Sequence, residues 1–472
     1  MKRITLPLVC AAAAALIVPA GVSAREKNEV NYGDRTTEVR HPEWMADAVI
    51  YEVNLRQGSA ERNLKGMQKH LPRLRDLGVD ILWLMPIHPI SEKNRKGELG
   101  SYYAVQDYKK VNPEFGTMED LKEFVRTAHS LGMKVILDEV CNHTGCDNVW
   151  LEVNPALYAR DEKGEMFGPF DWTDTYKLDY SNPDTRAAMI DALKFWVEEA
   201  DIDGYRCDVA GQVPVDFWNE ARPALEAIKP VFMLAEATEP ELLLEAFDAD
   251  YNWPMKDVFN DIAATQGVNE YAKAHGKKHK PANAETILEL LRSQNDHYPQ
   301  GGVLMNMVTN HDLNSWEGTE FERFGPSLGA FAVLSYTLPG MPMLYTGQEV
   351  GFNHAFEFFT TDTVPDYTPN EFTVFYEMLN SLKHSHPALN AANFDSLFTN
   401  HPTDNPNVIA FTRATAEDTV IMVANLGSEE ATLNFAGQAP QTSGLINYFT
   451  GAPAELPSTL RPWQWLLLTT PQ

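Results

Sequence analysis

The feature that most constrains the fold is a regular alternation of short apolar segments with amphipathic ones, from about residue 48 to residue 385. The apolar segments are nearly continuous runs of Val, Ile, Leu and Met, which is typical of parallel strands buried on both faces. The segments between them space their apolar residues as a helix does. About eight such β-then-α units in series predict a (β/α)8 TIM barrel, a fold of the α/β class.

The expected elements follow from these patterns. Strands are predicted at residues 48–55, 79–87, 133–140, 202–209, 231–236, 302–312 and 341–349, with a weaker one near 248–253. Helices are predicted at residues 64–77, 117–131, 183–200, 213–228, 326–337 and 369–384.

Two regions depart from the alternation. Residues 143–182, after the third strand, are rich in Gly, Pro, Asp and aromatic residues, and a connection this long predicts a small inserted B subdomain. Beyond residue 390 short alternating strands predict an antiparallel β-sandwich domain at 391–472. The catalytic barrel is then expected to cover residues 25–390.

The first 24 residues have the pattern of a signal peptide. Lys2 and Arg3 precede an apolar stretch that is too short to span a bilayer, and Val22-Ser23-Ala24 provides a small-residue cleavage site. We therefore expect an exported protein, periplasmic or extracellular, without a membrane anchor.

The charge balance restricts the partners. The chain has 66 acidic and 38 basic residues, a formal net charge of -28. Such a surface repels nucleic acid and anionic membranes, so we expect neither as a partner, and a neutral sugar is compatible with it. Beyond the signal segment Cys141, Cys146 and Cys207 remain. An odd number excludes complete pairing; we expect buried free thiols, with a Cys141–Cys146 bridge as the alternative.

Polar residues gather at the predicted carboxyl ends of four strands, where barrel enzymes place their chemistry. They are Asp138, Asn142 and His143 after the third strand, Arg206 and Asp208 after the fourth, Glu236 after the fifth, and Asn310, His311 and Asp312 after the seventh. One carboxylate at a strand end is commonly a helix cap, but Asp208, Glu236 and Asp312 together with an Arg and two His on one barrel indicate a site.

The acids suggest a reaction. Cleavage of a glycosidic bond needs one carboxylate at the anomeric carbon and one protonated carboxyl for the leaving oxygen. Arg206, two residues before Asp208, is expected to keep that acid ionised as a nucleophile. Glu236 follows an apolar run without an adjacent cation, so its pKa is expected to rise as a general acid requires.

These motifs resemble the four conserved regions of the α-amylase family, glycoside hydrolase family 13: D-x-x-x-N-H, G-x-R-x-D, an apolar strand ending in Glu, and N-H-D. The segment 101–117 resembles a further element of the family, whose tyrosine is Tyr103 here. The resemblance implies a retaining α-glucan hydrolase cleaving α-1,4 bonds in starch-derived glucans or maltooligosaccharides. It implies Asp208 as nucleophile, Glu236 as acid/base and Asp312 as transition-state stabiliser.

The resemblance also implies binding residues and raises the question of a metal. Tyr103, His143, Arg206 and His311 are expected to bind substrate, and Asp138 to have a structural hydrogen-bonding role. No organic cofactor is implied. Many family members bind calcium, for which Asn142 and Asp179 are the possible ligands here. The Lys-His pair that often follows the nucleophile is replaced by Ala210-Gly211-Gln212, so we expect activity without calcium.

Two alternatives remain open. A transglycosidase or disaccharide isomerase of the same family shares every catalytic residue. A non-catalytic carbohydrate-binding protein on the same fold predicts the loss of at least one acid, and all three are present.

Overall fold

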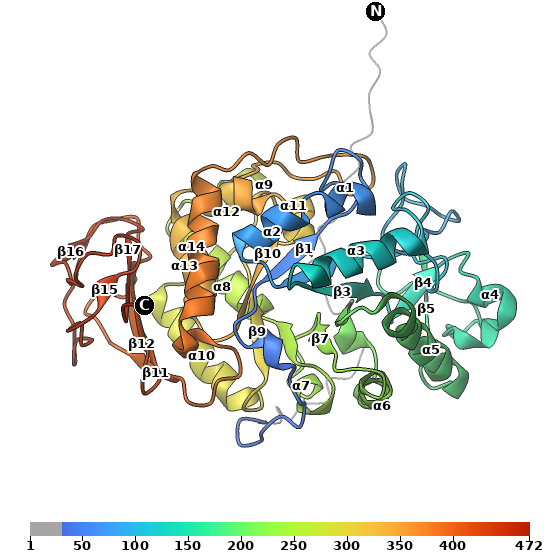
Figure 1. The fold of residues 1–472 in the computed structure, drawn as a ribbon, viewed down its shortest axis with the longest axis horizontal. Helices are drawn as coiled ribbons and strands as arrows, with labels where there is room; N and C mark the ends of the chain where they lie inside the picture. Colours follow the sequence, from blue (N-terminus) through green and yellow to red (C-terminus); the bar gives the residue numbers. More distant parts are fainter. Residues whose placement is uncertain (1–30) are drawn as a thin grey trace, which may run out of the picture.

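A computed structural model describes residues 31–472, so the proposed signal peptide lies outside the described residues. Eight parallel strands close into a barrel in the order β1-β10-β9-β8-β7-β6-β3-β2 (Figure 1). The strands are β1 (Ile50–Val53), β2 (Ile81–Leu84), β3 (Lys134–Glu139), β6 (Gly204–Cys207), β7 (Phe232–Ala235), β8 (Ala249–Tyr251), β9 (Val303–Asn306) and β10 (Met341–Tyr345). The predicted barrel is confirmed.

The barrel interior is filled by every second residue of its strands. Side chains of this inner cluster come from seven of the eight strands, and they include Ile50, Trp83, Ile136, Leu234, Tyr251, Met305 and Met343. The other residues of each strand face the surrounding helices and belong to a larger core. Because side chains alternate along a strand, the inner cluster and the outer core together bury both faces of each strand, which explains the continuous apolar runs.

The helices form the outer ring of the barrel. They are α1 (Leu64–Gln68), α2 (Leu71–Leu77), α3 (Met118–Ser130), α5 (Pro183–Ala200), α6 (Val215–Glu226), α7 (Leu242–Glu245), α8 (Trp253–Thr265), α9 (Glu270–His275), α10 (Ala284–His297), α11 (His311–Trp316), α12 (Glu320–Phe324), α13 (Leu328–Thr337) and α14 (Glu371–Ser385). The prediction of one continuous helix over residues 64–77 was wrong, because the chain forms α1 and α2 there. Pro72 stands in the first turn of α2, a position that suits proline, and the chain is interrupted before it.

The seventh strand is shorter than the predicted range 302–312. Strand β9 ends at Asn306, and His311 begins helix α11. The side chain of Asn310 accepts a hydrogen bond from the backbone N–H of Leu313 and so caps this helix. The N-H-D motif therefore lies on a helix N-terminus above the strand rather than on the strand itself.

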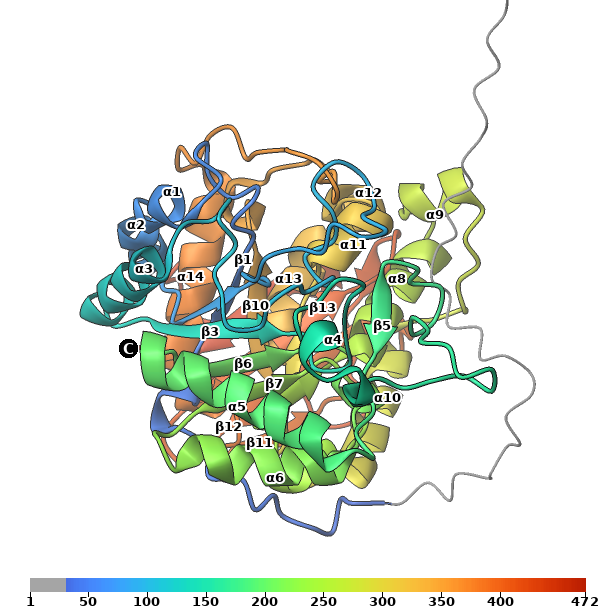
Figure 2. The ribbon, with the colours of Figure 1, turned by 90° about the vertical axis from the view of Figure 1, so that its right-hand side faces the viewer.

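The segment between β3 and α5 contains a two-stranded antiparallel sheet of β4 (His143–Gly145) and β5 (Thr175–Lys177), with the short helix α4 (Trp150–Val153) between them. Figure 1 shows these elements at the right-hand side of the molecule, and Figure 2, viewed from that side, shows α4 and β5 in front of the barrel. His143 is the first residue of β4, so the sheet is anchored directly beside the end of β3.

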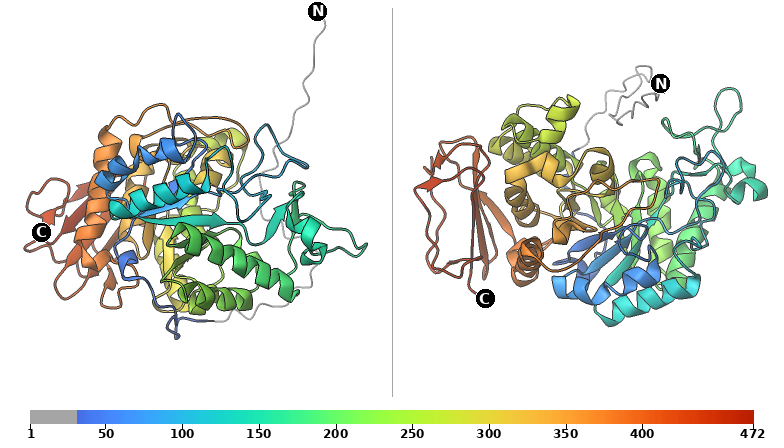
Figure 3. Two further views of the ribbon diagram at one scale, coloured as in Figure 1. Left: turned by 45° about the vertical axis from the view of Figure 1, so that its right-hand side comes forward. Right: turned by 90° about the horizontal axis from the view of Figure 1, so that it is seen from above.

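The chain ends in antiparallel sheets. One has the order β11-β12-β13-β17-β15 and the other pairs β14 with β16. The bounds are β11 (Leu397–Asn400), β12 (Val408–Ala414), β13 (Thr419–Asn425), β14 (Ala431–Thr432), β15 (Ile446–Asn447), β16 (Thr459–Leu460) and β17 (Trp465–Thr469). These sheets contact helices of the barrel, for example where Arg413 donates to the carbonyl of Thr337. Figure 3 shows them at the opposite end of the molecule from β4 and β5.

Within residues 31–472, no helix has the length and apolarity needed to cross a bilayer. The three cysteines Cys141, Cys146 and Cys207 are buried free thiols, as expected.

Candidate active site

The candidate site lies at the carboxyl ends of the barrel strands. Glu52, Asp138 and Arg206 each stand two residues after an inward-facing strand position, and they share its face because side chains alternate. Asp208 and Glu236 continue the same faces just beyond β6 and β7. All five side chains therefore point into the mouth of the barrel, where barrel enzymes hold their chemistry.

Arg206 connects the acids of the site. Its Nη1 lies 2.8 Å from Oδ1 of Asp138 and 3.0 Å from Oδ1 of Asp208, and its Nη2 lies 2.9 Å from Oε2 of Glu236. The guanidinium is fully buried, and its planar fork allows different nitrogens to contact different carboxylates. One cation thus holds Asp208 and Glu236 on the same side of the barrel mouth, close to each other.

The turn after β6 fixes the same pair through the backbone. Val209 adopts a left-handed conformation with φ 38°, which is unfavourable for a β-branched residue. This turn directs the N–H of Val209 to Oε2 of Glu236 at 2.8 Å. Strain of this kind persists only where the surrounding structure enforces it, and such positions cluster at functional sites.

The expected opposite pKa shifts of the two acids were wrong. Burial raises the pKa of Asp208 to about 6, although the Arg206 charge opposes this rise. Burial likewise raises the pKa of Glu236 to about 7 against the same cation. The sequence suggested that Arg206 serves Asp208 alone, but its guanidinium reaches both carboxyls. Glu236 still has the higher pKa, as the assignment of a proton donor requires.

Asp138 is fully buried beneath this cluster and anchors three side chains. Its carboxylate accepts hydrogen bonds from Trp83 Nε1 at 3.1 Å, from the Tyr103 hydroxyl at 3.1 Å and from Arg206 at 2.8 Å. With its carboxylate taken up by three protein donors, Asp138 has the geometry of the structural hydrogen-bonding residue that was expected.

His311 lies on the opposite side of the mouth, in contact with a residue that sequence reasoning missed. Its Nδ1 donates to Glu52 at 2.5 Å, and its backbone N–H reaches the same carboxylate at 3.3 Å. Burial lowers the pKa of His311, but the charges of Asp312 and Glu52 outweigh burial and raise it to about 9. The sequence did contain a signal for Glu52, since it is a charged residue inside the apolar strand segment IYEV. A charge buried in a barrel interior is costly without a partner, so a partner could have been expected.

Tyr103 stands between the two sides of the mouth. Its hydroxyl lies 2.8 Å from Nε2 of His311, and the two rings are stacked with centroids 5.5 Å apart. Asp312 follows on helix α11, with its carboxylate 3.4 Å from the same His311 nitrogen and 40% exposed. The structure therefore gathers Tyr103 and Asp312 with His311.

His143 lies in β4, directly beyond the end of β3. Burial lowers the pKa of its imidazole to about 3, so the ring is neutral. It packs against Trp172 of the inserted segment with ring centroids 5.1 Å apart. His143 thus joins the barrel mouth to the segment that contains β4 and β5.

The two possible calcium ligands have other partners. The side-chain nitrogen of Asn142 lies 3.3 Å from Nδ1 of His143. Oδ1 of Asp179 accepts from the backbone and the hydroxyl of Ser181. Among the residues the structure describes, no group of three or more His, Cys, Asp or Glu side chains is arranged to hold a metal ion. Activity without calcium stays a prediction, and the roles assigned to the residues of the site do not depend on a metal.

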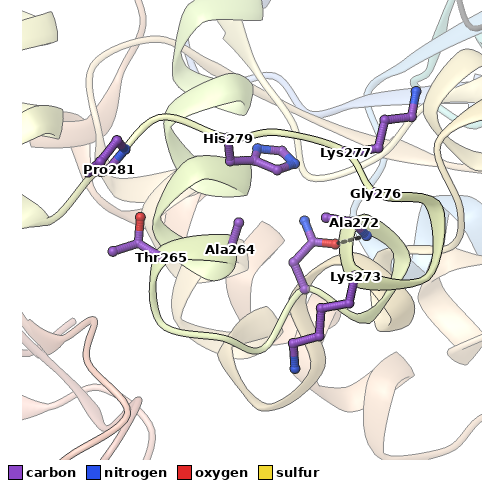
Figure 4. A pocket seen from close by; sticks show the side chains of 9 residues that line it. Ala264, Thr265, Ala272, Lys273, Gly276, Lys277, His279 and Pro281 are labelled. Carbon is purple, nitrogen blue, oxygen red and sulfur yellow. Dashed lines mark hydrogen bonds between the residues drawn. The ribbon is translucent and has the colours of Figure 1, made fainter.

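A separate pocket of about 480 Å³ involves none of these residues (Figure 4). It is lined by α8, α9 and the following loop, including Lys273, Lys277 and His279. The sequence did not indicate a site at these basic residues. Lys273 pairs with Glu270, and His279 contacts Asp261, so two of its basic groups are paired with acids.

A barrel with two neighbouring carboxyls at its mouth, linked by a buried Arg, has the pair of acids that glycoside hydrolysis requires. The family model described as alpha amylase, catalytic domain, matches residues 49–167 and 157–405. The protein belongs to the alpha-amylase family.

Relatives and solved structures agree with this family. An alpha-amylase from Haloarcula japonica is 27% identical over 438 residues, which cover 89% of this chain but only 61% of that protein. A maltogenic alpha-amylase from Bacillus acidopullulyticus is 27% identical, covering 86% of this chain and 74% of that protein. The structure of an alpha-amylase from Lactobacillus plantarum is 30% identical, with a TM-score of 0.76 over 90% of this chain and 99% of that one.

Proposed function

We propose that the protein is a retaining α-glucan hydrolase that cleaves α-1,4-glucosidic bonds in maltooligosaccharides or starch-derived glucans. The observation that carries this proposal is the contact of one guanidinium, that of Arg206, with both Asp208 and Glu236. Retention requires two carboxyls about 5–5.5 Å apart, whereas inversion needs about 6.5–9.5 Å to admit a water molecule. A shared guanidinium favours the shorter separation.

In the first step, Asp208 attacks the anomeric carbon while Glu236 donates its proton to the glycosidic oxygen. The bond to the leaving sugar breaks and a glycosyl ester forms on Asp208. In the second step, Glu236 removes a proton from water, which attacks the same carbon and releases Asp208. Arg206 keeps Asp208 oriented, and its positive charge stabilises the ionised form against burial.

The remaining residues bind and orient the reacting sugar. Tyr103 provides an aromatic ring at the mouth, and the positive charge that His311 carries at neutral pH, with its Nε2 2.8 Å from the Tyr103 hydroxyl, attracts the oxygen atoms of sugar hydroxyls. His143 is neutral, and its ring lies beside Tyr103, whose backbone it contacts. Asp312, which is partly exposed beside His311, stabilises the positive charge that develops on the sugar.

Relatives support an α-glucan as substrate. Their names include maltogenic alpha-amylase and cyclomaltodextrinase, the latter for a Bacillus protein 26% identical over 81% of this chain. The exported, short-B-domain character suggested by the sequence also remains a proposal. It is supported by residues 1–24 and by the small size of the segment between β3 and α5, and N-terminal sequencing of the secreted protein tests it.

Product analysis tests the activity. The purified protein is incubated with maltooligosaccharides, pullulan and trehalose, and the products are separated by chromatography. We expect shorter maltooligosaccharides from the first substrate. Products longer than the substrate indicate a transglycosidase instead, and an isomerised disaccharide indicates an isomerase. Binding without any product supports the non-catalytic alternative.

A further inference from the structure

Residues 273–280 are strongly basic in a chain that is strongly acidic overall. They contain four lysines and two histidines, whereas the whole chain has 66 acidic and 38 basic residues. Residues 262–284 around them contain one acid, Glu270. The acids that dominate the rest of the surface are therefore largely absent from this part of the chain, and a local positive field remains there.

The lysines of this stretch are exposed, and three of them have no acidic partner. Lys273 pairs with Glu270 at 2.7 Å, whereas Lys277, Lys278 and Lys280 form no ion pair with any residue between 31 and 472. Their charges are available to a ligand without the loss of an existing ion pair.

The backbone holds this stretch in a fixed loop after α9. The N–H of Lys277 donates to the carbonyl of Ala272 at 3.0 Å, at the end of the helix. The Thr265 hydroxyl donates to the carbonyl of Lys280 at 3.4 Å and accepts from the N–H of Ala282 at 3.0 Å. The lysines therefore extend from an ordered backbone.

The loop encloses a pocket with α8 and α9, and no carboxylate lines it (Figure 4). Lys273 and Lys277 contribute ammonium groups to the lining. Asn269, which is 2% exposed, caps α9 by accepting from the N–H of Ala272 at 2.8 Å through Oδ1. Its amide nitrogen has no hydrogen-bond partner within residues 31–472. A buried donor without a partner beside two ammonium groups fits an anion.

We propose that this pocket binds a phosphoryl group, with Asn269, Lys273 and Lys277 as its donors. A phosphoryl group carries about two negative charges and several strong acceptor oxygens, which suit an amide and two ammonium groups. The pocket contains none of the acids of the barrel mouth, so this inference does not depend on the proposed hydrolysis. The phosphoryl group belongs to a soluble phosphate compound or to a lipid headgroup, and the experiment distinguishes these sources.

Asn269→Asp is the sharpest variant. Aspartate keeps the oxygen that caps α9, because both residues are good N-caps, but it replaces the amide donor with a negative charge. The wild type should bind inorganic phosphate in calorimetry at physiological salt. We expect the Kd of the variant to be at least about tenfold higher, with an unchanged melting temperature. Lys277→Gln breaks no ion pair and should weaken binding in the same direction.

Asn63→Asp is the matched control. Asn63 caps α1 in the same way, accepting from the N–H of Gly66 at 2.9 Å, and Figure 2 shows α1 and α9 on opposite sides of the molecule. The two variants share the same chemical change and the same change in net charge, so Asn63→Asp should bind phosphate as the wild type does. A wild type that does not bind phosphate, or equal affinity in the wild type and Asn269→Asp, would overturn the pocket. Equal weakening in the two Asp variants would also overturn it, because the effect would then come from net charge.

Vesicles distinguish the two sources of the phosphoryl group. The wild type and Asn269→Asp are sedimented with vesicles of phosphatidylglycerol and with vesicles of phosphatidylcholine. If the wild type binds only the anionic vesicles and Asn269→Asp binds neither, the ligand is a lipid headgroup. If phosphate binds and the vesicles do not, the ligand is a soluble phosphate compound. Hydrolysis of maltoheptaose should be equal in the wild type and in both Asp variants. A loss of hydrolysis in Asn269→Asp that parallels its loss of phosphate binding would contradict a separate site.

Discussion

The imidazole of His311 donates from Nδ1 to the fully buried carboxylate of Glu52 at 2.5 Å. This hydrogen bond joins the first barrel strand to the N-terminus of α11 and fixes which His311 nitrogen faces the mouth. The negative charge of Glu52 also helps to keep His311 protonated. Glu52 is therefore a positioning residue for the proposed reaction.

Glu52→Gln should preserve the shape of this contact but remove its charge. We expect kcat/KM at pH 6.5 to fall by about tenfold to a hundredfold, because His311 loses the charge that helps keep it a hydrogen-bond donor at both nitrogens. Glu52→Asp should recover part of the activity. Glu349→Gln is the control, since Glu349 is a buried carboxylate that pairs with Arg73 instead of His311. If both Gln variants lose stability and activity alike, the role of Glu52 is only structural.

The pH dependence of kcat/KM should be a narrow bell. Asp208 must be ionised, and its pKa of about 6 sets the acidic limb. Glu236 must be protonated, and its pKa of about 7 sets the alkaline limb. Initial rates at low maltoheptaose concentration between pH 4 and pH 9 test this expectation. A plateau that extends to pH 9 would contradict Glu236 as the proton donor.

Glu236→Gln should lower kcat for unactivated glucans by roughly 10²- to 10⁴-fold, because the amide has no proton to donate to the leaving oxygen. An aryl glucoside with an acidic phenol as leaving group needs less protonation and should be much less affected. Near-normal cleavage of maltoheptaose by this variant would refute the assignment.

The same substitution should stabilise the fold at alkaline pH. Because the pKa of Glu236 rises from 4.5 to about 7 on folding, the folded protein binds this proton more tightly than the unfolded chain. Its contribution to stability therefore decreases as pH rises from about 4.5 to about 7. We expect the melting temperature of Glu236→Gln to exceed that of the wild type by on the order of a few degrees at pH 8, with no such gain at pH 4. A lower value at pH 8 would show that the carboxylate stabilises the fold.

Activity should persist after calcium is removed. Asn142 and Asp179 are held by neighbouring side chains, and the Lys-His pair of many calcium-binding relatives is absent. The measurements are the residual rate and the melting temperature after treatment with EDTA and desalting. A collapse of both that added calcium reverses would overturn this prediction.

The sequence predicted the barrel and the gathering of the acids at its mouth, because the strand pattern and the motif order are local. It did not predict the environment of those acids. The pKa directions depend on how far Arg206 reaches and on how deeply the two carboxyls are buried, which only the closed barrel determines. The strand predicted at residues 302–312 was too long. Residues 307 and 308 are apolar and buried, as strand residues are, although they lie beyond β9.

Glu52 was missed for a related reason. The role of Glu52 depends on a contact with a residue 259 positions away in the chain.

The central claim is a covalent glycosyl ester on Asp208, and active-site labelling tests it most directly. The protein is inactivated with a mechanism-based fluorinated α-glucosyl reagent, digested, and analysed by mass spectrometry. The account predicts one label on the peptide that contains Asp208, with proton NMR showing the α anomer as the first-formed product. A label on Asp312, or a β product, would contradict it.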